Sequence, residues 1–141
     1  MIAVDGNKID LKTDQFRDKF YHARAFEEFA PIPLPEGFDM DAVDKLSYEE
    51  RLAFLRNPEN LPDEYVHRLM YETGKILRAS STKPHPAVLG KNQIPGKVYV
   101  NQRTRMVVFV NKDGDVRTFI CASQRQLDRL EARNWHLFPN V

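Results

Sequence analysis

The sequence predicts an α+β fold: an antiparallel β-sheet of three to five strands packed by N-terminal and C-terminal helices, with a helical insertion. Runs of β-branched and aromatic residues at 97–100, 106–110 and 116–120 predict the strands. Asp113-Gly114 lies between the last two runs, and both residues tolerate the positive φ of a hairpin turn. An amphipathic pattern on either side of these runs predicts helices that cover the sheet.

The N-terminal part begins with a short hairpin or extended lead-in over residues 1–11. Aromatic and small apolar residues then recur at three- and four-residue steps, which predicts one amphipathic helix over about residues 14–28. Lys19, His22 and Phe26 share one face of such a helix. An ammonium group therefore lies one turn before an imidazole.

The middle of the chain is a proline-rich segment followed by helices. Alternating prolines forbid a helix over residues 30–38 and favour an extended segment. Ser47-x-x-Glu50 is a capping box that predicts a helix to about residue 55. A further helix is expected over residues 62–79, and the prolines and glycines of residues 80–96 predict a loop.

The last predicted element is a helix that begins at Ser123 and carries Leu127, Leu130 and Trp135. Just before it lies Cys121, the single cysteine of the chain, so no internal disulfide forms and a reducing compartment is favoured.

The length of 141 residues predicts one domain with three parts. These are a lead-in with a histidine-bearing helix (1–28), a proline-rich and acidic helical insertion (29–82), and a basic part with the sheet and closing helix (83–141). No apolar run is long enough to span a membrane and the N-terminus lacks the pattern of a secretion signal, so we expect action in the cytoplasm.

The charge is unevenly distributed along the chain. The formal net charge is +1, but residues 83–141 carry ten Lys and Arg against four acids, and residues 27–64 carry eleven acids against three bases. These counts predict a half that faces a polyanion and an acidic half that covers it when no substrate is bound. Two solvated surfaces are the alternative explanation.

Cofactor and metal chemistry have no support in the sequence. The four histidines are widely spaced, no cysteines are paired, and no glycine-rich phosphate-binding loop occurs. We therefore expect no cofactor and no metal.

Metal-independent cleavage of RNA needs only a group that transfers protons and cations that stabilise the charge developing on phosphorus. An imidazole can accept or release a proton near neutral pH, so His22 is the candidate general acid or base. Lys19 is the candidate phosphate ligand. Thr118 is a hydroxyl donor on the last strand. Cationic and aromatic side chains of the basic part are the candidate substrate-binding residues: Arg103, Arg105, Arg117, Lys83 and Tyr99.

Two blocks resemble the colicin D-type transfer-RNA nuclease domains found at the C-termini of colicin D and of some contact-dependent growth-inhibition toxins. The first block, residues 16–26, resembles the Lys-x-x-His-Ala-x-x-Phe helix of that family. The second runs from Tyr99 through Thr118 into Ser123-x-x-Gln126-Leu127-x-x-Leu130, and resembles the family's hairpin and closing helix. Together the blocks cover about 55 residues, in the family's order.

The resemblance implies a fold of the barnase/RelE-like ribonuclease class and metal-independent cleavage of transfer RNA. It assigns proton transfer to His22, phosphate binding to Lys19, and to Thr118 the place of a family serine. It also implies an acidic immunity or inhibitor protein as a partner, and delivery from outside the cell or in a virion. The chain differs from the family pattern at Tyr21, where the family has a second lysine, and at Ile120, where it has a tryptophan.

Two other functions are open. The first is a non-catalytic interaction protein, such as a virion or assembly component, with residues 30–38 and 80–96 as arms that pack on neighbouring chains. The second is a plain RNA-binding module that uses the hairpin arginines for phosphates and Tyr99 and Phe109 for stacking.

Overall fold

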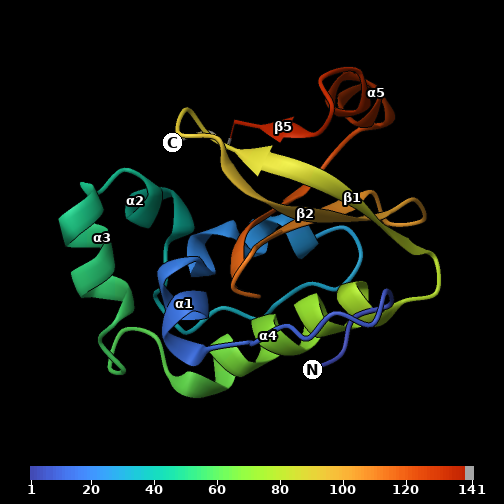
Figure 1. Cartoon of the computed structure of the whole chain (residues 1–141). Helices are drawn as coiled ribbons and strands as arrows, with labels where there is room; N and C mark the ends of the chain where they lie inside the picture. Colours follow the sequence, from blue (N-terminus) through green and yellow to red (C-terminus); the bar gives the residue numbers. More distant parts are fainter. Residues whose placement is uncertain (139–141) are drawn as a thin grey trace. The chain divides into compact units, whose positions relative to one another are not determined.

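The computed structural model describes residues 1–138, and its fold is α+β, with a mixed, curled sheet and several helices (Figure 1). The chain divides into two compact units, each described here by itself. The sheet unit contains residues 1–10 and 73–141, of which 139–141 lie outside the described part. The helical unit contains residues 11–72. That the whole chain is one domain stays a prediction.

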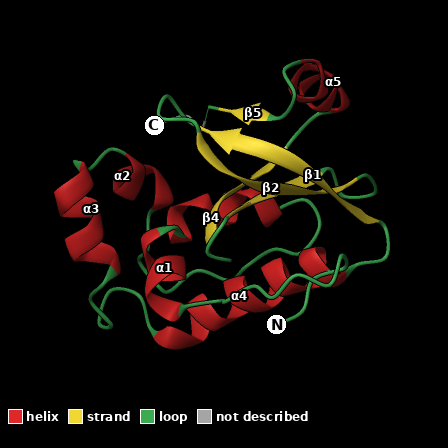
Figure 2. Cartoon of the chain, in the orientation of Figure 1, coloured by secondary structure: helices red, strands yellow, loops and turns green. Residues whose placement is uncertain are grey.

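The sheet has five strands in the order β4-β3-β2-β1-β5 (Figure 2). Their bounds are β1 Thr82–Leu89, β2 Ile94–Asn101, β3 Met106–Asn111, β4 Val116–Cys121 and β5 His136–Leu137. The first four pair antiparallel with their neighbours in sequence, and β5 pairs parallel with the end of β1. The three predicted strands and the turn at Asp113-Gly114 are confirmed, and Gly114 has a φ of 85° there.

The predicted loop over residues 80–96 is wrong, because most of it forms β1 and the start of β2. The amide of Val88 donates to the carbonyl of Trp135, next to β5 and on the side of β1 away from β2. Backbone polar groups alternate in direction along a strand, so the even-numbered residues of β1 all turn theirs away from β2. Pro84 and Pro86 belong to this even set. Their missing N–H groups therefore leave the β1–β2 ladder intact, which is why a strand can tolerate both prolines.

A cluster of apolar side chains packs one face of the sheet against the C-terminal helix. The helix, α5, spans Gln124–Ala132, and Ser123 caps it in a capping box with Gln126. Leu127 lies in the cluster, and Leu130 packs against it. Trp135 is also in the cluster but lies beyond the helix, with a φ of 59°, so its predicted place within the helix is wrong.

The lead-in is attached to the rest of the sheet unit by backbone hydrogen bonds. Ile2 and Lys8 form an antiparallel bridge around Asp5-Gly6, which confirms the predicted small hairpin. The amide of Asp10 then donates to the carbonyl of Gly114 at 3.0 Å. A Cβ atom at Gly114 would lie 2.9 Å from the carbonyl oxygen of Lys8, so this close approach depends on a residue without a side chain.

The helical unit contains α1 (Thr13–Asp18), a 3₁₀-helix η1 (Phe20–Phe26), α2 (Met40–Asp44) and α3 (Tyr48–Leu55); α4 (Asp63–Arg78) begins in it. Asp39 caps α2, and the predicted capping box of Ser47 and Glu50 opens α3. The proline-rich segment is not helical, as predicted: residues 31–35 have no regular secondary structure, and a turn follows at residues 36–37. That the segment is extended stays a prediction.

The predicted single helix over residues 14–28 is wrong, because the chain changes from α-helix to 3₁₀-helix at Lys19. Phe20, Ala23 and Phe26 are buried and recur at steps of three residues. A 3₁₀-helix has 3.0 residues per turn, so it places these three side chains on one apolar side. Burial of this side accounts for the change of helix type.

Candidate functional site

Lys19 and His22 remain neighbours although the helix between them is not α-helical. Side chains at i and i+3 eclipse in a 3₁₀-helix, and the amide of His22 donates to the carbonyl of Lys19 at 2.8 Å. Both residues are half-buried. Phe26, predicted to share their face, instead lies on the buried side.

Tyr21 joins the imidazole to a second cation. Its ring meets the ring of His22 edge to face, with centroids 4.2 Å apart. The guanidinium carbon of Arg51, from α3, lies 4.3 Å from the centroid of Tyr21. Burial raises the pKa of the Tyr21 phenol, while the charge of Arg51 acts in the opposite direction. The phenol therefore stays neutral and serves as a platform for the guanidinium.

These contacts form a basic cluster consisting of Lys19, Tyr21, His22 and Arg51. All four belong to the helical unit and all are half-buried. Such a cluster can bind a phosphate and exchange a proton with a group attached to it.

Thr118, the third predicted catalytic residue, lies in β4 of the sheet unit and is 1% exposed. It is opposite Phe109 in the β3–β4 register, next to the β-bulge that leaves Arg117 exposed. His22 belongs to the other unit, so the convergence of its imidazole with the Thr118 hydroxyl stays a prediction.

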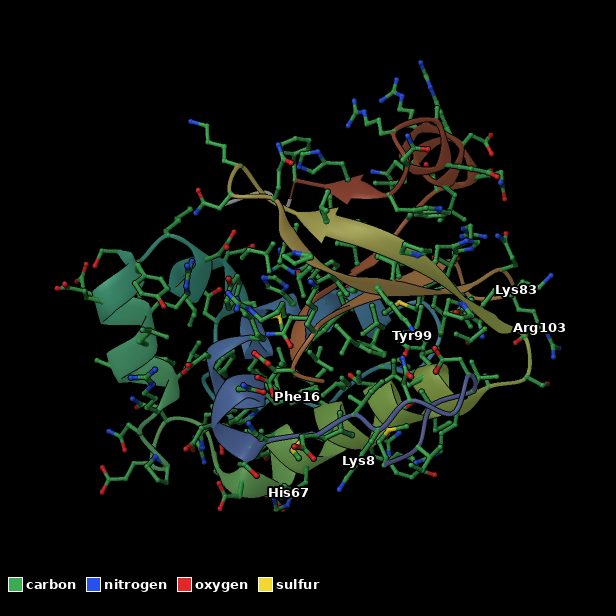
Figure 3. All side chains as sticks on the ribbon, viewed as in Figure 1. Lys8, Phe16, His67, Lys83, Tyr99 and Arg103 are labelled. Carbon is green, nitrogen blue, oxygen red and sulfur yellow. The ribbon has the colours of Figure 1, made fainter. Side chains whose placement is uncertain are left out.

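The predicted cations of the sheet unit fall into two groups. Lys83 and Arg103 are exposed at one end of the β1–β2 pair (Figure 3), and Arg117 is exposed on β4. Arg105 instead serves the fold: its Nε donates to the carbonyl of Ala122 at 3.1 Å, and its backbone carbonyl accepts from the amide of the same residue. Lys83, Arg103 and Arg117 therefore remain available to a ligand.

Tyr99 cannot stack on a base, because its side chain is buried and only 1% of the residue is exposed. Its hydroxyl donates to the carboxylate of Asp5 at 3.1 Å and accepts from the amide of Asn7 at 3.4 Å. Lys97 forms an ion pair with the same carboxylate at 3.1 Å. Although burial opposes it, hydrogen bonds from Asn7, Lys97 and Tyr99 lower the pKa of Asp5.

Phe109 is completely buried, so it cannot stack on a base as expected. Packing also changes the expectation for residues 30–38, since Ile32 is buried and the ring of Phe38 packs on those of Phe20 and Phe54. The segment is thus packed at Ile32 and Phe38, while Pro31, Pro33 and Leu34 are exposed, and its packing on neighbouring chains stays a prediction.

Within residues 1–138, no group of three or more His, Cys, Asp or Glu side chains has the arrangement of a metal site. Nor does any helix of this described part combine the length and apolar character that crossing a membrane requires.

Comparisons with protein-family models, with curated proteins and with solved structures found no match to this chain. The family resemblance of the two sequence blocks is thus an expectation that rests on the residues quoted for it.

Sequence reasoning missed two features. Arg51 is 30 residues from Tyr21 in the sequence, and no spacing rule connects them. A stacked pair of rings, His136 and Phe138, lies beyond the predicted closing helix with centroids 4.2 Å apart. The signal in the sequence was the group of apolar and aromatic residues Trp135, Leu137 and Phe138 near the C-terminus, of which Phe138 directly follows β5.

Proposed function

We propose that this protein is a metal-independent endoribonuclease that cleaves RNA by attack of the 2′-hydroxyl on the adjacent phosphorus. The basic cluster carries the proposal, because Tyr21 contacts both the imidazole of His22 and the guanidinium of Arg51, and Lys19 lies one 3₁₀ turn before His22. A phosphate that reaches His22 there meets two positive charges within the same cluster.

In this mechanism His22 transfers the proton. Its imidazole accepts the proton of the 2′-hydroxyl while the oxygen attacks phosphorus, and the bond from phosphorus to the 5′-oxygen breaks as that oxygen takes a proton from water. The protonated imidazole then returns its proton to solvent. The products are a 2′,3′-cyclic phosphate and a 5′-hydroxyl. Lys19 and Arg51 stabilise the negative charge on the phosphoryl oxygens. Arg51 thereby supplies the charge that the family pattern places at position 21, where this chain has tyrosine.

Substrate and partners follow from the resemblance and from charge. Transfer RNA is the proposed substrate, with Lys83, Arg103 and Arg117 as phosphate ligands. Thr118 is only 1% exposed, so its hydroxyl is proposed to make no contact with the substrate. An acidic immunity or inhibitor protein is the proposed partner. The site of action is the cytoplasm, reached from outside the cell or from a virion.

The test is cleavage of transfer RNA by the wild-type chain and by the His22→Ala variant. Removing a general acid or base lowers the rate by about 10²–10⁴-fold. His67→Ala is the matched control, because His67 is an exposed histidine on α4 in the same unit. The His67→Ala variant should cleave transfer RNA at the rate of the wild-type chain. Products should carry 5′-hydroxyl ends, and a chelator should leave the rate unchanged. Equal rates for His22→Ala and wild type would refute the proposal.

A further inference from the structure

Three arginines lie along α5 and its C-cap residue, Arg133. Arg125, Arg129 and Arg133 follow one another at steps of four residues, so their directions differ by about 40° per step around the helix axis. All three are exposed, and within residues 1–138 none of them forms an ion pair. The step of four residues corresponds to about 6 Å along the axis.

The helix also carries two acids. Glu131 lies on the opposite side of the helical projection. Asp128, three residues after Arg125, lies about 60° from it and accepts a hydrogen bond from the side-chain amide of Gln124 at 3.1 Å. Arg129 and Arg133 therefore have no acid three or four residues away in residues 124–133, and this stretch carries three arginines against two acids.

The orientation of the three arginines is set by the fold. The capping box of Ser123 and Gln126 satisfies amides at the start of α5, and Leu127 is buried in the core cluster. The helix cannot rotate without exposing Leu127. The arginines are thus presented to solvent as a fixed row.

A stacked pair of rings adjoins the end of this row. The amide of His136 donates to the carbonyl of Arg133 at 3.3 Å, and Nε2 of His136 lies 2.8 Å from the carbonyl of Gly90. The ring of Phe138 stacks on that of His136 at a centroid distance of 4.2 Å and an angle of 26°. Phe138 is nevertheless 55% exposed. A hydrophobic ring held in place and open to solvent can stack on a planar ligand.

We propose that Arg125, Arg129, Arg133 and the His136–Phe138 pair form a docking surface for single-stranded RNA. The arginine row binds consecutive phosphates, and an unpaired base stacks on Phe138. Single strands are favoured over duplex because the bases of a duplex are stacked on one another and do not offer a free face. The choice of RNA as the nucleic acid rests on the proposed function, whereas the surface itself involves none of the catalytic residues.

The experiment measures binding of a fluorescent single-stranded RNA by anisotropy, with the full chain in a His22→Ala background so that the RNA stays intact. The triple variant Arg125→Gln, Arg129→Gln, Arg133→Gln should raise Kd by about 10- to 100-fold, and lower the slope of log affinity against log salt by about 2. Phe138→Ala should raise Kd by about 5- to 100-fold, since one stacked base is lost.

The matched control removes three exposed charges elsewhere, through Lys45→Gln, Arg78→Gln and Lys112→Gln. It should change Kd by less than about threefold, because charges away from the contact act through screened, long-range fields. Unchanged melting temperatures confirm that each variant folds.

Three outcomes would overturn the inference: no RNA binding by the parent chain, equal losses in the triple variant and the control, or duplex RNA binding as tightly as single-stranded RNA. Loss of binding in the α5 triple variant, with no cleavage by the wild-type chain, would support the docking surface and reject the nuclease. Cleavage that depends on His22, together with wild-type RNA binding by the α5 triple variant, would support the nuclease and reject the docking surface.

Discussion

At the scale of single residues, Tyr99 shows how burial changes the chemistry of a side chain. Its ring is inside the sheet unit, and its hydroxyl hydrogen-bonds to the Asp5 carboxylate. Burial first, and then the negative charge of Asp5, raise the pKa of the phenol to about 12. Tyr99 is thus part of the fold's polar interior and holds the lead-in against β2.

This raised pKa predicts how stability depends on pH. Between about pH 10, the pKa in the unfolded chain, and about pH 12, the folded protein keeps the phenol proton that the unfolded chain has lost. The contribution of Tyr99 is therefore complete below pH 10 and is lost as pH rises through 12. Urea unfolding between pH 8 and 12 should show a steeper decline for wild type than for Tyr99→Phe. Parallel declines would show that the folded phenol titrates normally.

A second residue-scale feature is the buried guanidinium of Arg17. It is 4% exposed and donates to the carbonyl of Leu55 at 2.9 Å and to the carboxylate of Asp63. The hydrogen bond from Arg17 lowers the pKa of Asp63. Arg17, which belongs to α1, thus joins the end of α3 to the start of α4 within the helical unit. The role of this arginine is therefore structural.

At the scale of elements, β1 shows that prolines can be compatible with a strand when they face the correct side. Pro84 and Pro86 turn their nitrogens away from β2, and β5 reaches only Val88 and Leu89. Residues 82–87 therefore have a free edge on that side, where the missing N–H groups cost no ladder hydrogen bond.

This arrangement predicts an asymmetry between proline substitutions in β1. Pro84→Ala should change the free energy of unfolding by less than about 1 kcal/mol, because no ladder hydrogen bond is gained. Lys83→Pro should cost about 3 kcal/mol or more, since the amide of Lys83 faces β2 opposite Val100. Urea denaturation of the two variants gives the comparison. Equal effects of the two substitutions on the free energy of unfolding would mean that the amide of Lys83 does not hydrogen-bond to β2.

The elements also show where sequence patterns were sufficient. The capping box at Ser47, the start of a helix at Ser123 and the Asp113-Gly114 turn were predicted and are present, because each depends on residues within a few positions of one another. The change to a 3₁₀-helix at Lys19 was missed. Steps of three residues fit both helix types, and tertiary burial selects between them.

At the scale of the whole molecule, charge is the property that most affects the proposed binding of RNA. The chain has a net charge of +1, with its acids concentrated in residues 27–64 and its bases in residues 83–141. Negative charge anywhere on the chain lowers its attraction for a polyanion at low ionic strength. The expectation that the acidic part covers the basic part stays a prediction.

Neutralising acids should therefore increase RNA affinity. The triple variant Glu36→Gln, Glu49→Gln, Glu59→Gln removes three exposed negative charges and changes the net charge from +1 to +4. We expect Kd to fall by about two- to fivefold at low salt and the difference to vanish near 1 M salt, where the Debye length is about 3 Å. The matched control replaces the same residues with Asp, which preserves the charge. An equal fall in Kd for both variants would exclude the electrostatic explanation.

The sequence by itself determined the fold class, the three central strands with their hairpin, the caps of α3 and α5, and the adjacency of Lys19 and His22. These depend on local spacing, which a short stretch of chain contains in full. Only the tertiary structure decided that Arg51 lies over Tyr21, that Tyr99 and Phe109 are buried, and that residues 82–89 form a strand. Such properties arise from contacts between residues far apart in the sequence, because the exposure of one side chain depends on every residue that packs against it.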